Sequence, residues 1–96
     1  MSRPEQKLTE TDIRRQVRDY LRIRGWFVFH ILQGLGCYLG VTDLIAVRDG
    51  RVLFIELKTP RGRQSEYQRK FQADLEAAGG EYILCYGIDD LMERGI

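Results

Sequence analysis

Three charged residues interrupt the two most apolar runs of this 96-residue chain. Asp43 lies in "GVTDLIAV", and Glu56 and Lys58 lie in "LFIELKTP", where a core strand would carry valine or isoleucine. Aspartate is disfavoured inside strands, so these positions indicate chemistry rather than folding. Carboxylates bind hard divalent cations, and Mg²⁺ is often held by one or two of them together with waters and substrate phosphate.

A tight turn predicts that the two carboxylates face each other. Asp49-Gly50 separates the two apolar runs and is typical of a two-residue type I′ hairpin turn. Such a turn fixes the strand register, which places Asp43 opposite Glu56. Side chains in that position have Cβ atoms about 4.5–5.5 Å apart, and like charges there destabilise the sheet. The two-residue period of a strand puts Lys58 on the same face as Glu56.

The facing carboxylates need a cation, and the sequence offers more than one. Lys58 would complete a structural ion pair. A divalent metal would be held by Asp43 and Glu56, and the Leu57 carbonyl is in reach of it at a strand end. An ordinary charged patch on a solvent-facing sheet is the third reading, but the apolar neighbour Phe54 on the same face weighs against it.

A third acid precedes these strands on a predicted helix. Residues 9–24 show apolar residues at helical spacing, with Thr9 as a candidate cap. Glu10 extends the inward stripe of this helix and is placed to reach the site from its first turn. Stabilisation of the helix dipole explains Glu10 equally well.

The remaining elements predict an α/β fold with a mixed β-sheet and an α-β-β-β-α-β order. We expect strands at 26–32, 41–48 and 51–58, a helix at 64–78, a strand at 81–87 and a short terminal helix. A glycine-rich connection spans 33–40. The helix at 64–78 lies between two strands, which predicts a parallel pair with a right-handed crossover.

The second helix begins with "SEYQ", which fits a capping box. Ser65 would be the cap and Gln68 would reach back to it. Gln68 would otherwise be free to support the carboxylates, and the sequence leaves both roles open.

Composition and charge narrow the class of protein. The length predicts a single domain over residues 1–96. No apolar run approaches the roughly 20 residues of a membrane helix, and the polar N-terminus lacks a signal core, so we expect an intracellular protein. The net charge of the chain is +1, but the charge is unevenly distributed. Residues 1–24 have a net charge of +3, residues 58–70 of +4 and residues 71–96 of −5. Basic segments on one side would attract a polyanion, although solvated helix faces also explain them.

The ordered set of motifs resembles the PD-(D/E)XK nucleases, and its finer pattern resembles the VRR-Nuc (virus-type replication-repair nuclease) branch. The matching pieces cover nearly the whole chain: Glu10, "GVTDLIAV", "LFIELKTP", "QSEYQRKFQADLEAAGG" and "YILCY". Thr42 departs from the proline or serine that often precedes the aspartate. The resemblance implies a restriction-endonuclease-like core.

The resemblance also implies a role for each matching residue. Glu10, Asp43, Glu56 and the Leu57 carbonyl would bind Mg²⁺ or Mn²⁺. Lys58 would orient or activate the attacking water or stabilise charge on the phosphate, so that the catalytic residues would be Asp43, Glu56, Lys58 and Gln68. His30 has no partner evident in the sequence, and we expect a structural or DNA-contacting role for it.

The expected activity is hydrolysis of phosphodiester bonds in branched DNA by a metal-dependent endodeoxyribonuclease. Four-way-junction (Holliday-junction) resolution in viral or prophage replication or repair is the preferred reading, in the cytoplasm of a bacterial or phage-infected cell. A monomeric flap or nicking nuclease and a non-catalytic nucleic-acid-binding module of the same fold are the alternatives. Candidate DNA-binding residues are Arg14, Arg15, Arg18, Arg61 and Arg63.

A two-fold homodimer is the expected assembly, because one site makes one cut and junction resolution takes two. The predicted strand at 26–32 has apolar residues on both faces, and a second copy of the chain would cover one of these faces. The loop residues 37–39 and the terminal segment 88–96 also offer apolar side chains.

Overall fold

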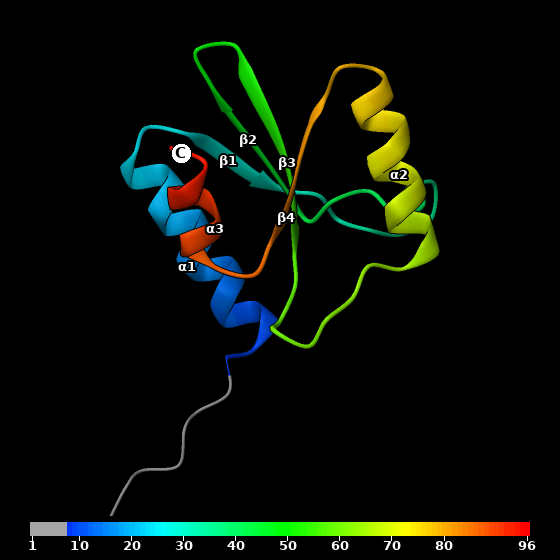
Figure 1. The fold of residues 1–96 in the computed structure, drawn as a ribbon, viewed down its shortest axis with the longest axis horizontal. Coiled ribbons are helices and arrows are strands. Elements are labelled where there is room, and N and C mark those ends of the chain that lie inside the picture. The colour runs from blue at the N-terminus through cyan, green and yellow to red at the C-terminus, as the bar shows by residue number, and fades with distance from the viewer. Residues whose placement is uncertain (1–7) are drawn as a thin grey trace, which may run out of the picture.

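The computed structural model describes residues 8–96, and it confirms the α/β class and the α-β-β-β-α-β order. The elements are α1 (Glu10–Ile23), β1 (Phe27–His30), β2 (Leu44–Arg48), β3 (Arg51–Leu57), α2 (Glu66–Ala77), β4 (Glu81–Cys85) and the terminal helix α3 (Ile88–Glu93). Figure 1 shows α1 and α3 on one side of the sheet and α2 on the other.

The sheet has the order β1-β2-β3-β4 and is mixed. β1, β2 and β3 form an antiparallel meander, and β4 pairs in parallel with β3 after the crossover through α2. Asp49 and Gly50 both have positive φ, at 51° and 81°, as a type I′ turn requires. The predicted hairpin register is confirmed, because Arg48 pairs with Arg51.

β2 begins three residues later than predicted. The last pair of the hairpin ladder is Leu44 with Ile55. At the next position, the side chain of Asp43 accepts a hydrogen bond from the backbone N–H of Leu57 at 2.9 Å. A carboxylate therefore replaces a backbone partner where β3 ends, and regular pairing stops there.

One face of the sheet carries the hydrophobic core. The buried side of α1, formed by Ile13, Val17 and Leu21, packs in one cluster with inward-facing residues of all four strands. α3 closes this layer with Leu91, followed by the terminal Ile96. The terminal segment therefore offers less exposed apolar surface than the sequence predicted.

The opposite face is only partly covered. Helix α2 contains no buried residue. Its Phe71 ring lies 6.0 Å from the ring of Phe54 and 6.2 Å from that of Tyr82, over β3 and β4. Over β1, Phe27 and Phe29 remain exposed and contact each other edge to face. The uncovered half of this face is thus apolar.

Both long helices begin with a capping box. Thr9 caps α1 with Asp12, and Ser65 caps α2 with Gln68. The backbone hydrogen bond from Thr9 lowers the pKa of the Asp12 carboxyl. None of the helices within residues 8–96 has the length and apolar character needed to cross a membrane.

Candidate functional site

The centre of the site is a buried carboxylate at the end of β3. Glu56 is 1% exposed, which is rare for a glutamate unless it is paired. Its Oε1 accepts a hydrogen bond from the side-chain amide of Gln68. Its Oε2 is buried and has no hydrogen-bond partner in the described part of the chain. A buried oxygen without a partner is costly to the fold, so this one indicates a ligand.

Electrostatics around Glu56 show that the site lacks positive charge. Burial, followed by the neighbouring Asp43 carboxylate, raises the pKa of Glu56 to about 9. The charge of Glu10 acts in the same direction, and only the charge of Lys58 opposes it. An additional cation would therefore stabilise the ionised carboxylate.

Gln68 makes both of the contacts that the sequence left open. Its Oε1 accepts a hydrogen bond from the backbone N–H of Ser65 at 2.9 Å and completes the capping box. Its Nε2 donates to Glu56. The two ends of one amide therefore link the first turn of α2 to the site.

Asp43 stands where three strand ends meet. Its carboxylate bonds the N–H of Leu57 at the end of β3. Its backbone carbonyl accepts from the N–H of Ile31, just past β1, at 2.9 Å. Lys58 N–H bonds the carbonyl of Cys85 at the end of β4. Asp43, Leu57 and Lys58 thus gather at one end of the sheet, as the register predicted.

Glu10 lies nearby but points partly to solvent. Its carboxylate forms a long ion pair with Arg14, at 3.6 Å, and its side chain is 52% exposed. Residues 8–96 contain no preassembled group of three or more His, Cys, Asp or Glu side chains suited to a metal ion. Glu10 as a third metal ligand stays a prediction, as does the Leu57 carbonyl.

The donor set fits a hard divalent cation. Two carboxylates, one with an unpartnered buried oxygen, are the oxygen ligands that Mg²⁺ and Mn²⁺ prefer. Lys58 is half-buried and forms no ion pair within residues 8–96, so its ammonium group is available to bind a phosphate. The chemistry of these residues therefore fits such an ion.

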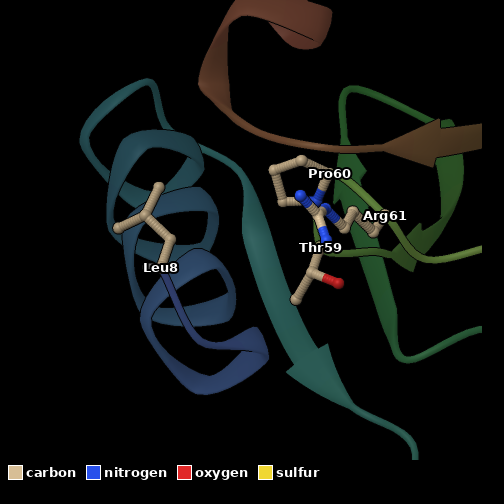
Figure 2. Close-up of a pocket in the computed structure, with 4 residues that line it drawn as sticks. All are labelled: Leu8, Thr59, Pro60 and Arg61. Carbon is tan, nitrogen blue, oxygen red and sulfur yellow. The ribbon is translucent and has the colours of Figure 1, made fainter. Parts of the chain in front are cut away.

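The segment after β3 continues from the site to a surface cavity. Figure 2 shows Leu8, before α1, facing Thr59, Pro60 and Arg61. These residues line a cavity of about 350 Å³. Arg61 therefore shares a cavity with Leu8, which precedes α1, and both Arg61 and Arg63 are exposed. The candidate arginines of α1 differ: Arg15 is exposed, whereas Arg14 and Arg18 are half-buried and pair with Glu10 and Asp19.

Sequence reasoning missed Gly40. A Cβ at this position would collide with the carbonyl group of Tyr67 and lie 2.8 Å from the backbone nitrogen of Gln68. Gly40 also has φ +82°, which side-chain-bearing residues rarely adopt. The absence of a side chain thus allows the loop before Asp43 to touch the first turn of α2. The sequence shows a glycine three residues before the aspartate, but it does not reveal that this glycine contacts the first turn of α2.

Comparisons with known proteins agree with this fold. The family model described as the VRR-NUC domain matches residues 5–89. A solved structure titled "VRR_NUC domain" superposes with a TM-score of 0.77 at 19% sequence identity. The match covers 88% of this chain and 94% of that one, and it shows a shared fold. No curated protein matches the chain. With a family match over most of its length, the chain belongs to the VRR-NUC family, nuclease domains of the PD-(D/E)XK type.

Proposed function

We propose that this protein is a metal-dependent, structure-selective DNA endonuclease that resolves four-way junctions in viral or prophage replication or repair. The observation that carries the proposal is the buried Glu56 beside Asp43, with one carboxylate oxygen left without a partner. A non-catalytic module would gain nothing from this arrangement, since a buried carboxylate without a cation destabilises the fold.

Each residue of the site would have a separate role in phosphodiester hydrolysis. A divalent cation, when bound, supplies positive charge to offset the charge that develops on the phosphate and favours deprotonation of the attacking water. Asp43 and Glu56 would hold that ion, with Glu10 and the Leu57 carbonyl as further ligands. Gln68 fixes the Glu56 side chain. Lys58 would contact the phosphate or the attacking water.

DNA would be held through its backbone. Arg61 and Arg63 follow the site directly and are exposed, and Arg15 lies exposed on α1. Contacts of this kind position a duplex but carry no sequence information. We therefore propose that the protein selects DNA by its shape and not by its base sequence.

The first test is cleavage of a panel of DNA structures. Labelled four-way junctions, forks, flaps and linear duplexes would be incubated with Mg²⁺, Mn²⁺ or EDTA. We expect cleavage with either metal, none in EDTA, and a preference for junctions. The metals should also raise the Tm of the protein, because they bind the folded state alone. Unchanged Tm together with cleavage in EDTA would contradict a metal site.

We further propose that the protein acts as a two-fold homodimer. An apolar patch around Phe27 supports this, because Phe27 is 62% exposed at the start of the edge strand β1, at the opposite end of the β1–β2 ladder from His30 and Leu44. Burying such a patch against a second copy stabilises an isologous interface. Two sites in one particle would allow paired cuts across a junction.

Light scattering tests the dimer, and we expect about twice the chain mass of 11.2 kDa. Phe27→Ser should shift the protein to monomer and reduce paired cuts to single nicks. Met92→Ser is the matched control, since Met92 is 55% exposed on α3, on the other side of the sheet. A monomeric wild type that cuts flaps efficiently and junctions not at all would instead favour a monomeric flap nuclease.

A further inference from the structure

A second basic cluster lies on the α1 side of the sheet, apart from the carboxylates. Arg18 and Arg22 are one helical turn apart and point to the same side of α1. Together with His30 at the end of β1 they line a cavity of about 330 Å³. The apolar part of its wall is formed by Val28, Phe29 and Leu44.

This cluster has little of its charge neutralised. Among the described residues, no acidic side chain lines the cavity. Within residues 8–96, Arg18 pairs only with its sequence neighbour Asp19, and the two side chains are 35% and 55% exposed. Arg22 forms no ion pair within residues 8–96, and its one hydrogen bond, to the Val28 carbonyl, is long at 3.4 Å. Two guanidinium groups and an imidazole are therefore available to an anion.

The register ties the cluster to the cleavage site. His30 pairs with Leu44, which follows Asp43 directly. Alternate residues of a strand point to opposite faces, so Leu44 lines the cavity on one face while Asp43 serves the site on the other. The edge of β1 separates the two. A DNA strand that contacts both must turn around this edge at its His30 end, away from Phe27.

We infer that Arg18, Arg22 and His30 bind backbone phosphate of a second DNA arm, and that this contact selects branched DNA. The inference rests on the proposed nuclease function. A straight duplex seated at Asp43 and Glu56 would lie against the face of the sheet that carries them, whereas the cluster lies on the opposite face. A branched molecule has an arm that diverges at the cut position and is free to cross the edge. The arginines add affinity only when such an arm is present.

Binding measured in EDTA tests the site without cleavage. Arg18→Ala combined with Arg22→Ala should weaken binding to a four-way junction by on the order of 10-fold at low salt and reduce its salt slope by about one per arginine. Binding to a linear duplex should change little. His30→Ala should weaken junction binding in the same direction. Arg94→Ala is the control, because Arg94 is an exposed arginine at the end of α3 and lies outside the cavity.

Neutral methylphosphonate links, placed singly along each junction arm, identify the phosphate. A neutral link at one position should weaken junction binding by the wild type. The same link should have no further effect on binding by the Arg18→Ala, Arg22→Ala protein. Equal losses for junction and linear duplex, or a loss no greater than that of Arg94→Ala, would overturn the inference. Absence of cleavage by the wild type in Mg²⁺ and Mn²⁺ would instead overturn the proposed function, and leave the binding result to stand by itself.

Discussion

Glu56→Gln should abolish cleavage and yet give a more stable protein in EDTA. Glutamine keeps the acceptor oxygen that Gln68 bonds, and it replaces the unpartnered oxygen with an amide that faces Asp43. The raised pKa of Glu56, about 9, means that this carboxyl must take up a proton when the protein folds at pH 7 in EDTA. Glutamine removes that cost, so the free energy of unfolding should rise by about 1–3 kcal/mol. Losing a metal ligand should lower the cleavage rate by about 10³-fold or more, since metal stabilisation of the transition state is worth several kcal/mol.

Chemical denaturation and cleavage of a labelled junction would be measured on the same samples. Adding Mg²⁺ should raise the Tm of wild type and leave that of Glu56→Gln nearly unchanged. Glu66→Gln is the control, because Glu66 is an exposed glutamate in the first turn of α2. The Glu66→Gln protein should cleave the junction at the wild-type rate. A Glu56→Gln protein that is less stable in EDTA than wild type would show that the carboxylate already has a structural partner.

Gly40→Ala should lose most of its activity while the fold survives. The new methyl group has no room beside Tyr67 and Gln68, so the first turn of α2 must move away. That movement pulls the Gln68 amide from Glu56. A displacement of about 1 Å in a supporting residue costs on the order of 10²-fold in rate. We expect such a loss in junction cleavage, with near-native circular dichroism.

Gly36→Ala separates this contact from backbone strain. Gly36 lies in the same loop with φ +87°, but nothing lies within 4 Å of an added Cβ. Both variants should lose about 1 kcal/mol of stability from the unfavourable backbone conformation, and Gly40→Ala should lose more because its methyl group also collides with α2. Only Gly40→Ala should lose cleavage. Equal activity in the two variants would mean that the contact with α2 does not position Gln68.

Local rules explain which parts of the fold were predictable. The Asp49-Gly50 turn determines its own conformation and, through it, the pairing of β2 with β3. Capping at Ser65 depends on residues three apart, and it was found from the sequence. The start of β2 was predicted too early, because the bond between Asp43 and Leu57 joins a side chain to a distant backbone group.

Tertiary contacts were less predictable. The place of Gln68 against Glu56 follows from how closely α2 approaches the sheet, and that approach depends on Gly40. The exposure of Phe27 and Phe29 depends on how far α2 reaches across the sheet. No residue pattern within β1 contains that information, because both faces of the strand are apolar.

The weak attachment of α2 has a consequence for the dynamics of the site. A helix without buried residues can detach and rejoin at a free-energy cost well below that of global unfolding. Each opening separates Gln68 from Glu56 and leaves the core of α1, α3 and the sheet in place. We therefore expect the site to alternate between an assembled and a disassembled form within one fold. A substrate that bridges α2 and the sheet favours the assembled form, and so completes the site that acts on it.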